Sequence, residues 1–150
     1  MVEKVVGQTA SVGFQVGVRR TLPISPERAW AFLTSAEGVK LWLGDVPPPS
    51  FRVGETFRST EGLSGEFRVV KEMQQLRLRW KKPDWPFTST LQIRLLPTTS
   101  GKTTISFHQE KLDHAKTREE MKKHWEAVLN AIREKTVNRT SERRGEHEDE

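Results

Sequence analysis

The sequence contains no cysteine and no tyrosine among its 150 residues. Without cysteine the chain forms no disulfide bond and offers no thiolate as a nucleophile or metal ligand. No stretch approaches the roughly 20 consecutive apolar residues that a membrane-spanning helix needs. The first residues also lack the apolar run behind a basic segment that marks a signal peptide. These absences predict a cytoplasmic protein that does not associate with a membrane.

Recognisable catalytic and metal-binding motifs are also scarce. The chain has neither a Gly-x-Ser-x-Gly nucleophile elbow nor a glycine-rich phosphate loop. His108 and Glu110 have the spacing of a zinc motif, but the cysteine pair that zinc deaminases add is missing. Strand alternation places both on an outer sheet face, as a solvated pair. His114 and His124 are ten residues apart rather than four, which excludes a helical metal pair. We expect no metal and no cofactor.

Positive charge exceeds negative charge, with 25 lysines and arginines against 20 acids and a net charge of +5. Residues 139–150 hold three arginines and five acids, a net charge of −2, so residues 1–138 carry +7. Because this tail has no apolar residue to bury, we expect residues 137–150 to be disordered, and residues 1–12 to be flexible. The excess positive charge on residues 1–138 either forms a solvated surface or attracts an acidic protein partner.

Alternating apolar and polar residues predict a series of strands. Residues 13–22 place Phe14, Val16 and Val18 on one side and polar residues or glycine on the other. Similar patterns follow at residues 54–60, 64–73, 74–82, 87–97 and 102–110. Their short, turn-prone connections are typical of an antiparallel meander with one wet face.

Three helices are expected from capping residues and helical spacing. Ser25 and Pro26 predict a start at Pro26 for a helix to about Thr34, and a second short helix covers residues 36–43. Thr117 and Glu120 fit a capping box that would begin the last helix. An apolar stripe runs along this helix through Met121, Trp125, Val128, Leu129 and Ile132.

This order of elements predicts an α+β helix-grip fold. A curved antiparallel sheet with one apolar face needs a cover, and the long C-terminal helix is the element long enough to supply it. The sheet would wrap around that helix, with two short helices after the first strand. We expect one such domain over residues 13–136.

The motifs, taken in order, resemble the START-like or SRPBCC helix-grip superfamily. The likeness is closest to the family of the C-terminal domain of the heat-shock protein 90 ATPase activator, and it covers about residues 14–135. Its residues are Pro26-Glu27, Trp30, Thr34, Leu41-Trp42-Leu43, Phe51, Gly54, Phe57, Gly65, Leu76 to Trp80, Ser89 to Leu95, His108, Trp125, Leu129 and Ile132. Ile132 stands where leucine is usual, and residues 81–87 look individual to this chain. The resemblance implies a cavity between sheet and long helix, and members that bind apolar molecules, assist chaperones or act as cyclases or hydrolases.

The chain has five tryptophans, and their placement decides what the interior holds. Trp30 is expected in the core, and Trp42 either plugs the core or borders the cavity mouth. Trp85, on a loop between two prolines, either latches over the cavity or is exposed to a partner. The expected ligand-binding residues are the aromatic and apolar residues of the concave face: Trp42, Phe57, Phe67, Trp80, Trp85, Phe87, Phe107, Trp125 and Leu129.

Two further groups of charged residues are candidates for a function. Asp45, Glu66 and Asp84 are acid or base candidates if one of them is buried near the cavity. A basic outer sheet face is predicted at Arg68, Arg77, Arg79, Lys81 and Arg94, as a solvated surface or a docking site for an acidic protein. Nucleic acid is not expected there, because no aromatic side chain is interleaved with these charges for base stacking.

The sequence therefore predicts a domain that binds an apolar or amphipathic small molecule or serves a chaperone-like partner, as a monomer or weak homodimer. The alternative is a cyclase- or hydrolase-type enzyme that uses the same cavity. An enzyme needs a titratable group that points into the cavity, whereas a carrier does not.

Overall fold

The computed structural model describes residues 8–9 and 13–138. In chain order its elements are β1 (Gln8–Thr9), β2 (Gly13–Leu22), α1 (Pro26–Thr34), α2 (Ala36–Trp42), β3 (Thr56–Arg58), β4 (Ser64–Lys71), β5 (Gln75–Lys81), β6 (Ser89–Pro97), β7 (Thr103–Leu112), α3 (Ala115–Arg133) and a π-helical turn, η1 (Glu134–Asn138). The strands form one antiparallel sheet in the order β1-β2-β7-β6-β5-β4-β3.

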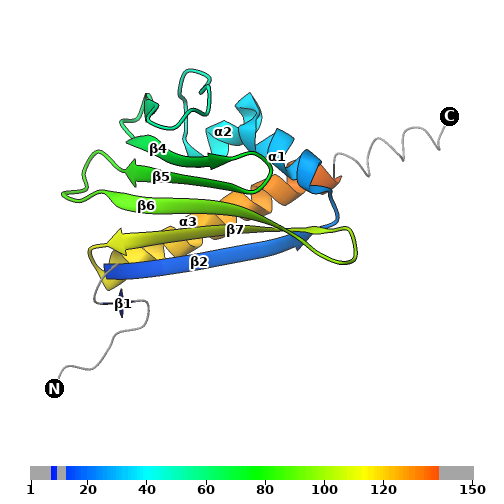
Figure 1. The fold of residues 1–150 in the computed structure, drawn as a ribbon. Helices are drawn as coiled ribbons and strands as arrows, with labels where there is room; N and C mark the ends of the chain where they lie inside the picture. Colours follow the sequence, from blue (N-terminus) through cyan, green and yellow to red (C-terminus); the bar gives the residue numbers. More distant parts are fainter. Residues whose placement is uncertain (1–7, 10–12, 139–150) are drawn as a thin grey trace.

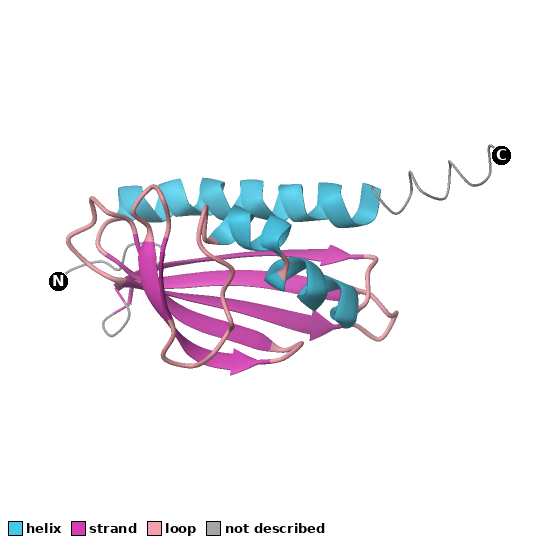
Figure 2. Ribbon diagram, turned by 90° about the horizontal axis from the view of Figure 1, so that it is seen from above, coloured by secondary structure: helices cyan, strands magenta, loops and turns pink. Residues whose placement is uncertain are grey.

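The long helix α3 lies across one face of the curved sheet, with α1 and α2 on the same side (Figures 1 and 2). Strands β3 to β7 follow one another as hairpins, and β2 closes the arrangement by pairing with β7. This pairing joins the first long strand to the last one, so that the two short helices between β2 and β3 fold back toward α3. The predicted α+β helix-grip fold is thereby confirmed.

Alternation decides which side chains fill the space between the sheet and α3. In β5, Leu76, Leu78 and Trp80 are buried, and in β7 Ile105 and Phe107 are buried, as the period of two predicts. The apolar stripe of α3 faces them, and the five residues predicted for it are buried. The core is therefore one layer between the inner sheet face and the helices, to which α1 and α2 add buried residues such as Leu33 and Trp42.

Gly65 shows how closely the sheet packs at the edge formed by β3 and β4. A Cβ at this position would lie 1.8 Å from the backbone oxygen of Arg79 and 2.6 Å from the ring of Phe57. The aromatic ring therefore lies over the glycine, and a larger side chain would push the paired strands apart.

The first helix begins as predicted, but the start of the last helix differs. Ser25 caps α1, and its side chain accepts a hydrogen bond from the backbone N–H of Arg28. The N-cap of α3 is His114, whose Nδ1 accepts from the N–H of Lys116, so the predicted capping box at Thr117 is wrong. The Thr117 hydroxyl donates to Asp113 instead, at 3.0 Å. The helix starts one turn earlier because an imidazole nitrogen replaces the expected hydroxyl.

The proposed domain limits remain a prediction. Gln8 and Thr9, placed in the flexible N-terminal segment, form a short strand that pairs with β2. Val137 and Asn138, assigned to the tail, belong to the π-helical turn that follows α3. The other residues of 1–12 and the tail from residue 139 lie outside the described residues.

Candidate functional site

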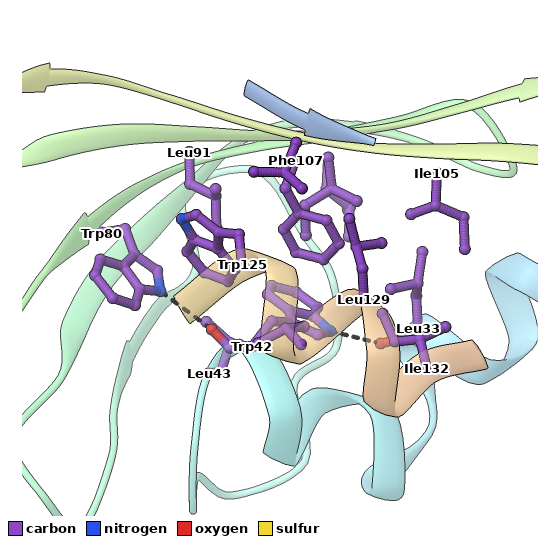
Figure 3. Close-up of a cluster of buried hydrophobic side chains, with 14 of the residues drawn as sticks. Leu33, Trp42, Leu43, Trp80, Leu91, Ile105, Phe107, Trp125, Leu129 and Ile132 are labelled. Carbon is purple, nitrogen blue, oxygen red and sulfur yellow. Dashed lines mark hydrogen bonds between the residues drawn. The ribbon is translucent and has the colours of Figure 1, made fainter. Parts of the chain in front are cut away.

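Three tryptophans meet in the interior, each with its indole N–H satisfied. The Trp80 Nε1 donates to the backbone oxygen of Trp42 at 3.1 Å, and the Trp42 Nε1 donates to that of Leu33 at 2.9 Å (Figure 3). The ring centroids of Trp80 and Trp125 are 5.3 Å apart. The predicted meeting of these two residues between sheet and helix is therefore present. Because their rings and polar atoms are all partnered, Trp42, Trp80 and Trp125 fill space here as packed core.

A buried glutamine connects this cluster to the sheet. Gln109 accepts a hydrogen bond from the Trp125 Nε1 at 2.8 Å and donates to the Ser89 hydroxyl at 2.9 Å. That hydroxyl in turn donates to the backbone oxygen of Trp80. The sequence analysis gave Gln109 no role. It lies two residues after Phe107 in the same strand, however, so strand alternation places both on the inner face. The chain of bonds fixes the Trp125 ring relative to β6 and β7.

A pocket of about 430 Å³ opens beside the cluster, where the end of α2, the β3–β4 turn, the start of the β5–β6 loop and α3 come together. We call it the tryptophan pocket. Its walls are mainly apolar, and four charged residues also line it. The lining residues are Lys40, Leu41, Trp42, Leu43, Gly44, Ser59, Glu61, Leu63, Trp80, Lys82, Pro83, Asp84 and His124.

Gly44 forms the sharp bend that turns the end of α2 into this wall. Its backbone φ of +84° lies in the left-handed region, where a side chain would be strained. After the bend, the N–H of Thr60 donates to the backbone oxygen of Asp45 at 2.9 Å, which holds the β3–β4 turn beside the α2 end. The two segments that form this side of the pocket are therefore tied together by the backbone.

His124 is the histidine that lines the pocket, on the α3 side. Its ring centroid lies 4.6 Å from that of Trp125 and 6.0 Å from that of Trp80. Burial, with the nearby Lys82 ammonium as a second cause, lowers the pKa of His124 from 6.5 to about 4. The imidazole is therefore neutral near pH 7.

The imidazole nitrogens of His124 are accessible from the pocket side of the helix. Within the described part of the chain they make no hydrogen bond to protein, and no fully buried side-chain nitrogen or oxygen there lacks a partner. Sequence reasoning considered His124 only as a metal ligand. Its spacing of three from Met121 and four from Val128 placed it on the apolar stripe, which was the signal that it faces inward.

The predicted ligand-binding residues separate into four groups. Trp42 and Trp80 line the tryptophan pocket. Phe57 and Phe67 pack in a neighbouring aromatic group, with centroids 5.7 Å apart. Phe107, Trp125 and Leu129 are fully buried core residues, and the loop residues Trp85 and Phe87 stack on each other at 4.5 Å. A ligand role for these nine residues stays a prediction, and those outside the pocket walls have a structural role that the contacts explain.

Trp85 and Trp30 are half-buried. Trp85 packs on Trp80 with centroids 5.5 Å apart, and the Lys82 ammonium lies 5.9 Å from its ring centroid. It therefore covers a flank of Trp80 next to the tryptophan pocket without lining it. Trp30 packs against the core, as expected, but one side remains exposed.

The candidate acids and the His-x-Glu motif do not form a catalytic or metal centre in the structure. Asp45 and Asp84 are exposed, and Glu66 lies at the sheet surface, where its carboxylate is 3.4 Å from Arg68. The expected pair of His108 and Glu110 is wrong, because each is bonded to a neighbouring strand instead. The contacts are His108 Nε2 to Gln15 Oε1 at 3.0 Å and Arg77 Nη2 to Glu110 Oε1 at 3.5 Å. Among the described residues, no group of three or more His, Asp or Glu side chains could hold a metal ion.

The outer sheet face carries the predicted basic residues and a shallow hollow of about 330 Å³. Arg68, Arg77, Arg79 and Lys111 line this hollow, which lies over β4 to β7. Two of the four are ion-paired, Arg68 with Glu66 and Arg77 with Glu110.

In the described parts of the chain, none of the helices is both long and apolar enough to cross a membrane.

Comparisons with known proteins identify a family and a set of similar folds. A family model described as "Activator of Hsp90 ATPase homolog 1-like protein" matches residues 23–135. No curated protein matches the chain. Protein MLL2253 from Mesorhizobium loti is 24% identical, with 84% of this chain and 98% of that one covered and a TM-score of 0.71.

Two other similar structures have descriptive titles. The Aha1 dimer from Colwellia psychrerythraea is 16% identical, with 81% of this chain and 95% of that one covered and a TM-score of 0.68. PFC0360w, an HSP90 activator from Plasmodium falciparum, is 19% identical, with 65% and 73% covered and a TM-score of 0.56. Because these three structures are less than 25% identical to this chain, their similarity shows that the fold is shared and no more.

Proposed function

Because this chain belongs to the family of activator of Hsp90 ATPase homolog 1-like proteins, and because its helix-grip fold carries a pocket beside the buried tryptophans, we propose that it binds an apolar or amphipathic small molecule there. The observation that carries the proposal is the tryptophan pocket itself. Its volume of about 430 Å³ lies in the usual range for small-molecule sites, roughly 300–1,000 Å³. Leucine, proline and indole surfaces face it, with a few polar groups around them.

The chemistry of the pocket wall favours binding over acid–base catalysis. His124 is a titratable group in the cavity, which is what the cyclase or hydrolase alternative requires. However, a general base works best when its pKa is near the working pH, and the pKa of His124 is lowered to about 4. A neutral imidazole of this kind is a weak base, but it still offers a ligand one hydrogen-bond donor and one acceptor.

A thermal-shift screen against apolar and amphipathic compounds tests this function. A ligand at 100 times its dissociation constant stabilises the native state by about 2.7 kcal/mol, which for a chain of this size raises the melting temperature by roughly 5–10 °C. The substitution Leu41→Trp should fill the pocket and abolish the shift. Leu96→Trp, at a half-buried position outside the pocket, is the matched control and should keep it. Shifts of equal size in both variants would refute binding at this site.

A second candidate function is docking of an acidic protein on the outer sheet face. The observation that favours it is the hollow lined by four basic side chains, of which Arg79 and Lys111 have no carboxylate within 4 Å in the described structure. The family description names activation of an Hsp90 ATPase, so a chaperone of that class is the partner to test.

The test is the ATPase rate of an Hsp90 chaperone with increasing amounts of this protein. The wild type should change the rate at low salt and lose its effect as ionic strength rises. Arg79→Glu should remove the effect, while Arg133→Glu, at an exposed position of α3, should keep it. An unchanged ATPase rate with the wild type, or equal behaviour of the two variants, would exclude this docking surface.

A further inference from the structure

The charged residues around the tryptophan pocket differ in their exposure. Two are cations, Lys40 and Lys82, and two are anions, Glu61 and Asp84. Lys40, Glu61 and Asp84 are exposed, whereas Lys82 is half-buried. Solvent and salt screen an exposed charge more than a half-buried one. Lys82 is therefore the least solvent-screened of these four residues, although the four formal charges cancel.

Lys82 is also available to a ligand. Its ammonium lies 5.9 Å from the centroid of the Trp85 ring, and within the described residues it has no carboxylate partner within 4 Å. The position follows directly after β5, so the strand end holds its backbone beside the pocket. A cation at the edge of an apolar wall, without an ion-pair partner, is the group that an incoming anion can neutralise.

His124 faces the pocket from α3, across from Lys82, and responds to this ammonium. The Lys82 charge is a cause of its lowered pKa, and no carboxylate contributes in the opposite direction. The charged residues that line the pocket with His124 are Lys82 and Asp84 from the β5–β6 loop, Lys40 from α2 and Glu61 from the β3–β4 turn. Glu120 lies one turn earlier on α3 and is exposed. The positive charge of Lys82 that acts on the imidazole would also attract a negatively charged ligand group.

We propose that the tryptophan pocket selects apolar molecules that carry a carboxylate, with the Lys82 ammonium as the counter-ion and the His124 imidazole as a hydrogen-bond donor to that group. This inference rests on the proposed ligand-binding function and names the ligand class. The apolar part of the ligand would lie against the walls of the pocket, formed by Leu41, Leu63 and Trp80. The carboxylate would replace the missing partner of Lys82, as a charge-assisted contact in a partly desolvated position.

The experiment compares two probes of nearly the same shape, 2-naphthoate and the neutral 2-naphthamide, by titration calorimetry at pH 7 and constant salt. The wild type should bind the naphthoate about fivefold more tightly or better. Lys82→Met removes the charge and keeps the aliphatic stem, so it should bring the two affinities together without weakening the naphthamide. Lys81→Met is the matched control, because the Lys81 side chain lies in a separate hollow with Glu66 and Arg79 and does not line the tryptophan pocket. Its ammonium donates to the backbone oxygen of Lys82 at 3.4 Å and not to a pocket group, so this variant should keep the preference.

Each outcome separates this inference from the function on which it rests. Equal affinity of both probes for the wild type would overturn the carboxylate preference and leave small-molecule binding intact. A preference that persists in Lys82→Met would overturn the role of Lys82. If Leu41→Trp still prefers naphthoate, the anion binds outside the tryptophan pocket, and the inference is overturned. Failure of both probes and of the apolar compounds to bind would overturn the proposed function together with this inference.

Discussion

The pH dependence of stability offers a direct test of the environment deduced for His124. Its pKa is 6.5 in an unfolded chain and about 4 in the native state, because burial and then Lys82 disfavour the charged imidazole. Between these two values the unfolded chain binds a proton that the native state does not bind. Stability should therefore be constant with respect to this group above pH 6.5 and should fall as the pH drops toward 4.

The magnitude follows from the size of the shift. Each unit of pKa corresponds to about 1.4 kcal/mol, so the contribution of His124 amounts to about 2 kcal/mol at pH 5 and at most about 3 kcal/mol at pH 4. His124→Gln removes the titrating ring and keeps a polar side chain that can reach the pocket. Between pH 6.5 and 4 the free energy of unfolding of the wild type should fall by this amount relative to that of the variant. Above pH 6.5 the two free energies should change in parallel.

The assay is urea unfolding at closely spaced pH values, followed by tryptophan fluorescence, because three of the five tryptophans are buried in the core. Lys82→Met should reduce the pH dependence without abolishing it, since burial is the larger cause of the lowered pKa. Lys81→Met should leave it unchanged. If the wild type and His124→Gln lost stability in parallel between pH 6.5 and 4, His124 would be protonated as easily in the native state as in the unfolded chain. The account of the pocket wall would then be refuted.

Three further substitutions test the packing around the site, each by urea unfolding. Trp125→Ala should cost about 3–5 kcal/mol, because the ring is fully buried against Trp80 and Phe107; a loss below about 1 kcal/mol would contradict a filled interior. Gln109→Ala should cost about 1–3 kcal/mol by leaving the Trp125 N–H without its acceptor, and an unchanged stability would argue against that bond. Gly65→Ala should cost about 1–3 kcal/mol, because its Cβ would overlap backbone of the next strand; a neutral result would show that the strand edge can yield.

The elements of this fold were predictable because their signals are local. The bounds of β2 match the prediction, residues 13–22, and α1 begins and ends at the predicted residues. Alternation in β5 and the helical stripe of α3 identified the faces that meet in the core. The cap of α3 was missed because hydroxyl caps are the usual kind, whereas here the imidazole of His114 accepts the bond.

The pocket was not predictable in the same way, although two of its residues were. Trp42 was expected either to plug the core or to border the cavity mouth, and Trp80 to point to the concave face; both line the pocket, and their ligand role stays a prediction. The structure also shows that their rings are part of a filled core, so the open space lies beside them rather than along the whole groove between sheet and helix. His124 and Lys82 were not among the expected site residues, since a lone histidine and a loop lysine have no motif that marks them.

Local patterns in the amino-acid sequence were enough to predict the order of elements, the inner faces of the main strands, the apolar stripe of α3 and the family likeness. These depend on periods of two and about four residues and on the order of short motifs, which are properties of neighbouring residues. Which tryptophans fill the core, where a pocket remains and which charged residues line it depend on the packing of distant segments. A pocket is the volume left over after segments distant in the chain, here α2, the β3–β4 turn, the β5–β6 loop and α3, have packed together. No local pattern records that volume, because it depends on how the side chains of all four segments fit at once.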